Sequence, residues 1–194
     1  RFVEGVQSKG VGATPKHFAC NGNEDHRFAG DSLVSERALQ EIYLKAFRQT
    51  VRESHPWALM TAYNKINHVF CSENPRLLQD ILRKEWGFDG VVMTDWGGTH
   101  DKIASLRSGC NLEMPGQVDH NVALVEEGLD QGSLSKQELL SSLAPMLELE
   151  RRTSKREKKG KEIFTAHAEL ALSLALDSIV LLKNEDGALP LSPS

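Results

Sequence analysis

Short apolar runs alternate along the chain with longer segments in which apolar residues recur at every third or fourth position. The apolar runs are typical of strands buried in a parallel sheet, and the longer periods are typical of amphipathic helices that cover such a sheet. This alternation predicts an α/β fold built from strand–helix units. Strands are predicted over residues 10–18, 57–62, 90–94 and 111–114, and helices over 35–51, 75–86, 99–109, 122–129 and from 135 onward.

Local signals for helix ends support several of these boundaries. Asn74 followed by Pro75 is typical of a helix start, because Asn caps the first turn and proline suits the first helical position. Ser135 and Glu138 have the spacing of a capping box, and Ser35 is the expected N-cap of the first long helix. The predicted buried face of that helix consists of Leu39, Ile42, Tyr43, Ala46, Phe47 and Val51.

The number of strand–helix units indicates a partial barrel. About four units are predicted, whereas a complete eight-unit (β/α) barrel needs roughly 250 residues. We therefore expect a partial TIM-like barrel over residues 1–149. The segment 150–163 is rich in Lys and Arg but has no interleaved aromatic residues, so it is expected to be a linker rather than a nucleic-acid-binding patch. Residues 164–194, with a helix over 164–176 and a strand over 179–182, are expected to open a second domain.

Composition and charge narrow the possible partners. The formal net charge of −4 at pH 7 gives no reason to expect binding to nucleic acid or to an anionic membrane. The longest apolar runs are too short to span a bilayer. Arg1 is not followed by the apolar stretch of a signal peptide. Cys20, Cys71 and Cys110 are too few for a disulfide framework, and their odd number slightly favours a cytoplasmic location over a periplasmic or secreted one.

Polar side chains follow the ends of all four predicted strands. Because the active site of a (β/α) barrel lies at the C-terminal ends of its strands, we expect these side chains to share one face. Cations can clamp hydroxyl groups, aromatic faces can stack on a sugar ring, and a carboxylate can attack an anomeric carbon. The combination favours a sugar site. Its candidate residues are Lys16, His17, Arg27, Tyr63, Asn64, Asp95, Trp96, Glu113 and Met114.

Each candidate also has a purely structural interpretation. Lys16 and Arg27 could neutralise the nearby Glu24 or Asp25, and His17 could be a hydrogen-bonded core histidine. Lys16 at a strand end is also compatible with the Schiff-base lysine of an aldolase.

Two further residues have equally ordinary alternatives. Tyr63 could pack against its neighbours with its hydroxyl bonded to the backbone. Asp95 directly follows a buried strand and could cap the next helix. The remaining histidines do not have the spacing of metal ligands, so neither a metal site nor a cofactor is expected.

At these same residues the chain closely resembles glycoside hydrolase family 3, the β-glucosidase and β-xylosidase group. The segment Ile81–Trp96 is similar to the family's nucleophile signature over its whole length. Four other stretches carry the likeness, namely Lys16-His17-Phe18 with Asn21, Glu24 and Arg27, then Met60–Asn64, Leu112–Gly116 and Ser178–Leu191, the last resembling the entry into the family's second, α/β sandwich domain.

The resemblance implies a retaining exo-β-glycosidase acting on a terminal β-glucoside or oligosaccharide, with no cofactor. Asp95 would attack the anomeric carbon and form a covalent glycosyl-enzyme. Residues 1–149 would be the second half of the barrel domain, and 164–194 the beginning of the sandwich domain. By the same resemblance Lys16, His17 and Arg27 would hold sugar hydroxyls, Tyr63 would orient the nucleophile, and Met60 and Trp96 would shape the pocket wall.

The resemblance also implies missing parts. In the family, the first barrel strands would precede Arg1, and the acid/base Glu of two-domain members would lie beyond Ser194. We therefore expect the isolated segment to be inactive and to need further sequence, or a second chain, to supply both. Two alternatives stay open. One is a non-catalytic sugar-binding or assembly subunit. The other is a single-domain β-N-acetylglucosaminidase, in which Asp25-His26 would correspond to the Asp-x-His-type dyad of those enzymes.

Overall fold

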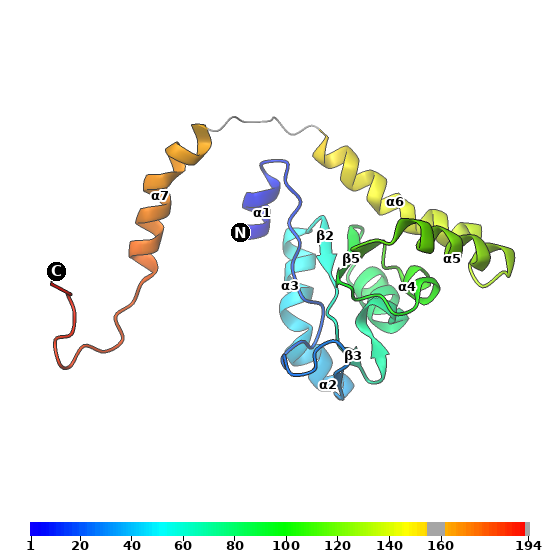
Figure 1. Cartoon of the computed structure of the whole chain (residues 1–194), viewed down its shortest axis with the longest axis horizontal. Coiled ribbons are helices and arrows are strands. Elements are labelled where there is room, and N and C mark those ends of the chain that lie inside the picture. Colours follow the sequence, from blue (N-terminus) through cyan, green and yellow to red (C-terminus); the bar gives the residue numbers. More distant parts are fainter. Residues whose placement is uncertain (155–161, 193–194) are drawn as a thin grey trace. The chain divides into compact units, whose positions relative to one another are not determined.

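The computed structural model describes residues 1–154 and 162–192. The chain divides into two units, Arg1–Arg156 and Glu157–Ser194 (Figure 1). The first unit contains all the strands of the described residues.

A parallel sheet lies at the centre of the first unit. Its three strands are β2 (Ala58–Met60), β5 (Val91–Trp96) and β6 (Leu112–Met114), in the order β2-β5-β6. The first pair is in simple register, Ala58 opposite Val91. The predicted strands over 57–62, 90–94 and 111–114 are therefore confirmed. Ala58, Leu59, Val91 and Val92 are buried, as expected for a parallel sheet, whereas the residues of β6 are half-buried.

The predicted strand over residues 10–18 forms an extended segment beside β2 instead of a regular strand. Backbone hydrogen bonds join the two, from Ala58 N–H to Ala13 C=O and from Phe18 N–H to Met60 C=O. Pro15 has no N–H and so cannot donate to a ladder, which explains the interruption. The extended segment nonetheless lies parallel to β2 at the edge of the sheet, in the place of a fourth strand.

A second, small sheet was not predicted. It consists of β1 (Asp31–Ser32), β3 (Lys65–Ile66) and β4 (Val69–Phe70), with β3 and β4 joined by a tight hairpin. Strands of two residues are too short to give a periodic signal.

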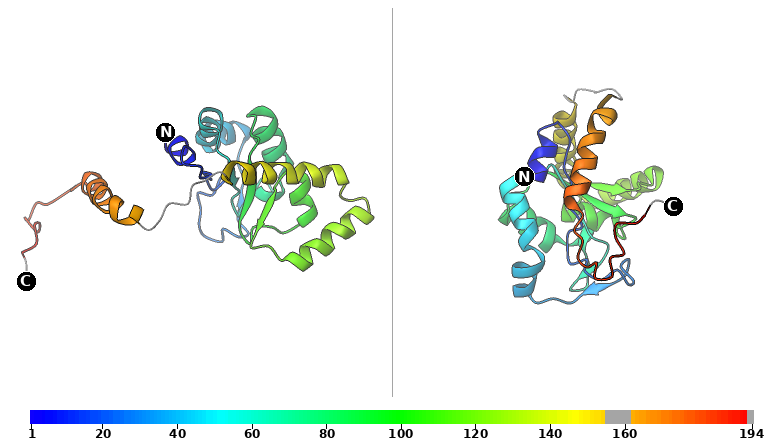
Figure 2. Two further views of the ribbon diagram at one scale, coloured as in Figure 1. Left: turned by 90° about the horizontal axis from the view of Figure 1, so that it is seen from above. Right: turned by 90° about the vertical axis from the view of Figure 1, so that its left-hand side faces the viewer.

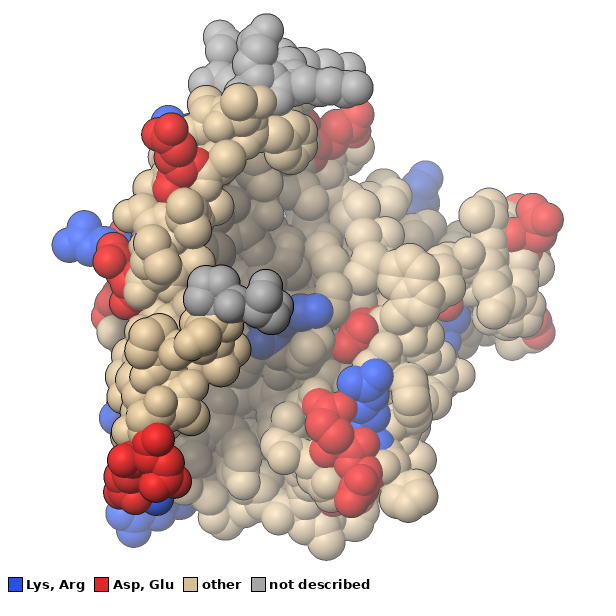
Figure 3. Space-filling model, turned by 60° about the vertical axis from the view of Figure 1, so that its left-hand side comes forward, with Lys and Arg blue, Asp and Glu red and all other residues tan. Residues whose placement is uncertain are grey.

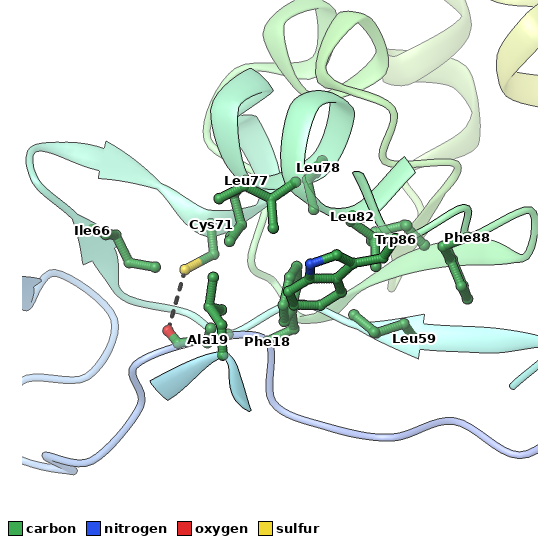
Figure 4. Close-up of a cluster of buried hydrophobic side chains, with 14 of the residues drawn as sticks. Phe18, Ala19, Leu59, Ile66, Cys71, Leu77, Leu78, Leu82, Trp86 and Phe88 are labelled. Carbon is green, nitrogen blue, oxygen red and sulfur yellow. Dashed lines mark hydrogen bonds between the residues drawn. The ribbon is translucent and has the colours of Figure 1, made fainter. Parts of the chain in front are cut away.

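The hydrophobic core lies between the parallel sheet and the helix η3 (Arg76–Glu85). Leu77, Leu78, Ile81 and Leu82 of this helix are fully or almost fully buried. Figure 4 shows leucines of η3 and Trp86 gathered over Phe18 and Leu59. The ring of Phe18 packs edge-on against Trp86, with centroids 5.8 Å apart. The core therefore fixes the extended segment that carries Lys16 and His17.

The first long helix contains a π-helical turn that changes its buried face. It consists of α2 (Glu36–Ala38), η1 (Leu39–Tyr43) and α3 (Lys45–Ser54). In η1 the N–H of Leu44 bonds to the C=O of Leu39, so the side chains that follow are shifted by one position. Leu39 and Leu44 are buried, whereas Ile42 and Tyr43 are 68% and 44% exposed. The prediction that Ile42, Tyr43 and Ala46 face the core was wrong.

Several ends of the remaining helices lie at residues that the sequence signals named. Asn74 accepts a hydrogen bond from Leu77 N–H, and the capping box of Ser135 and Glu138 is present in full. Gly109 ends its helix with a left-handed φ of 92°, which glycine adopts without strain. The unit's other helices are α1 (Phe2–Gln7), η2 (Cys71–Glu73), α4 (Lys102–Ser108), α5 (Val118–Asp130) and α6 (Lys136–Thr153).

The basic segment 150–163 begins inside a helix. Helix α6 continues through Thr153, and Arg151 and Arg152 both pair with Glu148. Residues 155–161, the greater part of the expected linker, lie outside the described residues. Within the described part of the chain, no helix is both long and apolar enough to cross a membrane.

The second unit contains the helix α7 (Glu162–Ser178) followed by an irregular segment with a turn at Glu185-Asp186 (Figure 2). The helix confirms the one expected over 164–176. The strand expected over 179–182 is not formed. An apolar run becomes a strand only when a neighbouring strand takes up its backbone hydrogen bonds, and this unit has no other strand among its described residues.

Candidate active site

Three of the predicted site residues lie at the C-terminal ends of β2, β5 and the extended segment that runs parallel to β2. His17 is on the extended segment beside β2, Tyr63 follows β2, and Asp95 lies near the end of β5. Because these three segments run in the same direction, their C-terminal ends meet at one edge of the sheet. The expected clustering of strand-end residues is therefore a consequence of the fold.

Asp95 has a hydrogen-bonding partner at each carboxylate oxygen. Its Oδ2 lies 3.1 Å from Nε2 of His17, and its Oδ1 accepts a hydrogen bond of 2.7 Å from the N–H of Trp96. The side chain of Asp95 is 17% exposed. It is therefore held by the protein yet can be reached from solvent.

The helix that follows β5 is capped by a different residue. Asp101 is the N-cap of α4, and its Oδ1 accepts a hydrogen bond of 2.9 Å from the N–H of Ala104. The interpretation of Asp95 as a helix cap was therefore wrong.

Tyr63 is buried beside Asp95. Its hydroxyl donates a hydrogen bond of 2.9 Å to the C=O of Trp96. Burial, followed by the neighbouring Asp95 carboxylate, raises the pKa of the Tyr63 phenol above its usual value. The phenol therefore stays protonated and remains a donor at neutral pH. Its hydroxyl does bond to the backbone, as the structural interpretation expected, but the bond is to a residue adjacent to Asp95.

Arg27 joins this cluster through aromatic rings. Its guanidinium lies 5.2 Å from the ring centroid of Tyr63 and 5.3 Å from that of Phe28, and the two rings are 4.5 Å apart. Arg27 also forms an ion pair of 2.8 Å with Glu24. The ion pair confirms that Arg27 neutralises Glu24, whereas its role in binding a sugar stays a prediction. Phe28 was missed, because a single aromatic residue in a polar loop carries no periodic signal.

The side chains of Lys16, Met60 and Trp96 form none of these contacts, although the backbone of Trp96 bonds to both Asp95 and Tyr63. Lys16 is exposed and makes no ion pair or side-chain hydrogen bond with any described residue. Trp96 is 64% exposed, and Met60 is half-buried at the end of β2. A Schiff-base lysine needs a desolvated or electropositive setting, so the exposure of Lys16 gives the aldolase hypothesis no support. Asp25 and His26 are exposed as well.

The loop that follows Asp95 is fixed by Glu73, which was not predicted. One carboxylate oxygen of Glu73 accepts the N–H groups of both His100 and Asp101, at 2.7 and 2.9 Å. The hydroxyl of Ser72 donates to the C=O of Gly98 at 2.6 Å. These bonds tie η2 to the segment between β5 and α4.

Glu113, another strand-end candidate, has a structural role. Its carboxylate binds Lys102 Nζ at 3.0 Å and Asn121 Nδ2 at 2.9 Å, which joins β6 to α4 and α5. Within residues 1–154 and 162–192, no group of three His, Cys, Asp or Glu side chains could hold a metal ion. On the face drawn in Figure 3, acidic and basic side chains are intermixed.

Comparisons with known proteins find similar sequences over nearly the whole chain. Residues 1–149 match the model of the glycosyl hydrolase family 3 N-terminal domain. The chain is 46% identical to an exo-α-(1→6)-L-arabinopyranosidase of Bifidobacterium longum, with 98% of this chain and 25% of that protein covered. It is 41% identical to the thermostable β-glucosidase B of Acetivibrio thermocellus, with 99% and 26% covered.

A solved structure shows the same arrangement of the chain. β-Glucosidase 3B of Thermotoga neapolitana, in complex with α-D-glucose, superposes with a TM-score of 0.87 at 40% identity. The match covers 98% of this chain and 28% of that one. The chain thus spans about a quarter of the length of the curated relatives it matches.

Proposed function

The chain belongs to glycosyl hydrolase family 3 through its N-terminal domain, and on that premise we propose that it contributes the nucleophile to a retaining exo-β-glycosidase. The observation that carries this proposal is the carboxylate of Asp95 near the end of a buried parallel strand, 3.1 Å from His17 Nε2. Strand ends of this kind carry the catalytic groups of (β/α) barrels. The site is partly open and polar, as a site for a terminal sugar must be.

The proposed reaction proceeds in two steps. A carboxylate oxygen of Asp95 attacks the anomeric carbon of a terminal β-linked sugar, and the bond to the leaving-group oxygen breaks as that oxygen takes a proton from a general acid. Water then attacks the anomeric carbon of the glycosyl-enzyme, releases Asp95 and gives its proton to the same acid/base group. The anomeric configuration is retained, and no cofactor is required.

Neighbouring side chains would bind different parts of the sugar. Lys16, His17 and Arg27 would hold sugar hydroxyl groups, because charged donors bind such groups strongly. Met60 and the exposed indole of Trp96 would form the wall of the pocket. The substrate class is a β-glucoside or an oligosaccharide with a terminal β-linked sugar.

We propose that further sequence or a second chain completes the enzyme. Among the described residues, β6 has no strand on its outer side, and an open parallel edge is a place where another strand can pair. A general acid typically contributes 10²–10⁴-fold to such a reaction, and no second carboxylate lies beside Asp95 in the described contacts. The 194 residues alone should therefore turn over substrate poorly. Residues 1–149 would be the second half of the barrel, 150–163 a linker, and 164–194 the beginning of an α/β sandwich domain.

Covalent labelling tests the proposed nucleophile. When the complete enzyme is treated with a 2-deoxy-2-fluoro glycoside, we expect one fluorosugar mass on the peptide that contains Asp95, because the fluorine slows release of the glycosyl-enzyme. Peptide mass spectrometry locates the label. Labelling at another carboxylate, or labelling that persists in Asp95→Ala, would refute the assignment. Sugar binding without turnover or labelling would instead support a non-catalytic sugar-binding subunit.

Tyr63→Phe should slow catalysis without disturbing the fold. The variant keeps the ring that packs on Phe28 but removes the hydroxyl bonded to Trp96 C=O beside Asp95. Because this hydroxyl helps to position the segment that carries the nucleophile, its loss should lower kcat about 10²-fold. Steady-state kinetics with an aryl β-glycoside would measure the loss. Tyr43→Phe is the matched control, because Tyr43 is exposed on η1, and its kcat should equal that of the unaltered enzyme.

A further inference from the structure

The strand that carries Asp95 is irregular at that residue. Met93 of β5 pairs with Leu112 of β6, and Trp96 pairs with Met114, with a register shift between the two pairs. Thr94 and Asp95 of β5 therefore face a single residue of β6. This is the geometry of a β-bulge, which is rare between parallel strands and is frequent next to active sites, where it redirects a side chain.

A side-chain hydrogen bond closes the bulge. Oγ1 of Thr94 accepts a hydrogen bond of 3.0 Å from the N–H of Met114, so a hydroxyl replaces the backbone carbonyl that a regular ladder would offer. The C=O of Met114 then accepts the N–H of Gly97 at 2.6 Å. Thr94 is completely buried, and water cannot take the place of its hydroxyl. The bulge is therefore held from both sides of Asp95.

We propose that Thr94 is a positioning residue whose hydroxyl holds this bulge so that the carboxylate of Asp95 faces His17 Nε2. Thr94 itself touches no substrate, and it acts through the backbone of its neighbour. Without the hydroxyl, the partly buried N–H of Met114 loses its acceptor and the bulge must rearrange to find another. A small displacement of a reacting group is enough to lower a rate about 10²-fold. The catalytic consequence rests on the proposed function, whereas the structural consequence does not.

The structural consequence can be tested by NMR with the complete enzyme, in which the histidines and methionines are isotopically labelled. Asp95→Ala provides the reference spectrum for a His17 imidazole that has lost its carboxylate. We expect Thr94→Val, which removes the hydroxyl but keeps the branched shape, to move the His17 ring resonances toward this reference and to speed hydrogen exchange at the Met114 amide. Thr94→Ser keeps the hydroxyl and should leave both unchanged. Thr94→Ala provides a smaller hydroxyl-free variant should valine prevent folding.

The catalytic consequence is tested by steady-state kinetics in the complete enzyme. We expect Thr94→Val and Thr94→Ala to lower kcat about 10²-fold with little change in KM, and Thr94→Ser to stay within about threefold of the unaltered enzyme. The proposal is overturned if the hydroxyl-free variants leave the His17 resonances in place. It is equally overturned if Thr94→Ser shifts them as much as Thr94→Ala does, because packing would then be the cause. Failure of the fluorosugar to label Asp95 would refute the glycosidase assignment alone.

Discussion

Replacing Asp95 with alanine is expected to lower kcat for an aryl β-glycoside by at least about 10⁴-fold in the complete enzyme, the scale of loss when a covalent catalyst loses its nucleophile or its activating partner. The substitution removes the carboxylate that would attack the anomeric carbon. The fold should persist, because the side chain lies at the end of β5 and the core packs on the other residues of that strand. The residual rate would be measured by incubating the purified variant with substrate for a long time, with a reaction that lacks the protein as the blank.

Rescue by an external nucleophile separates loss of the nucleophile from damage to the site. With azide and a substrate that has a good leaving group, Asp95→Ala should form a glycosyl azide of inverted configuration, since azide enters the space that the carboxylate vacates. Asp101→Ala is the matched control, because Asp101 caps α4 and its loss costs about 1 kcal/mol of stability but no catalytic group. Activity retained by Asp95→Ala, or an azide product of retained configuration, would contradict the nucleophile role.

The sequence predicted the parts of the fold that depend on neighbours along the chain. Helix starts at Asn74 and Ser135 follow from side chains that bond to the backbone three residues ahead, and both bonds are present. The apolar runs that became β2 and β5 were visible because buried strands of a parallel sheet need continuous apolar residues. Strand ends then located His17, Tyr63 and Asp95 near one another.

What the sequence could not predict depends on contacts between distant segments. The π-helical turn in η1 moved Ile42 and Tyr43 out of the core, and no local signal marks such an insertion. The run over 179–182 is as apolar as the true strands, yet it formed none, because strand formation requires a partner. The same limit applies to the site. The ring of Phe28 meets Tyr63 only through the fold, and the bulge at Asp95 exists only in the pairing of β5 with β6.

Arg83→Ala is expected to lower the free energy of unfolding by about 3 kcal/mol, within the range for breaking a buried hydrogen-bond network. The guanidinium of Arg83 donates to the C=O of Gly109 and to Oδ1 of Asn111, both at 2.9 Å, and more weakly to the C=O groups of Phe88 and Gly90. Burial lowers the pKa of Arg83 from its usual value, but the group stays charged at neutral pH. One side chain thus joins η3 to the residues that precede β5 and β6.

Removing Arg83 should therefore loosen the sheet that carries the candidate site. Urea unfolding followed by tryptophan fluorescence reports on the first unit, which contains all three tryptophans of the chain. Arg107→Ala is the matched control, since Arg107 makes only a partly exposed ion pair of 3.2 Å with Glu138, and such pairs contribute about 1 kcal/mol or less. Arg83→Lys should fall between the two, because an ammonium group cannot reach several acceptors in one plane. If Arg83→Ala were no more destabilising than Arg107→Ala, the hydrogen bonds of Arg83 would not stabilise the sheet. The positions of the strand ends would then be fixed by core packing alone.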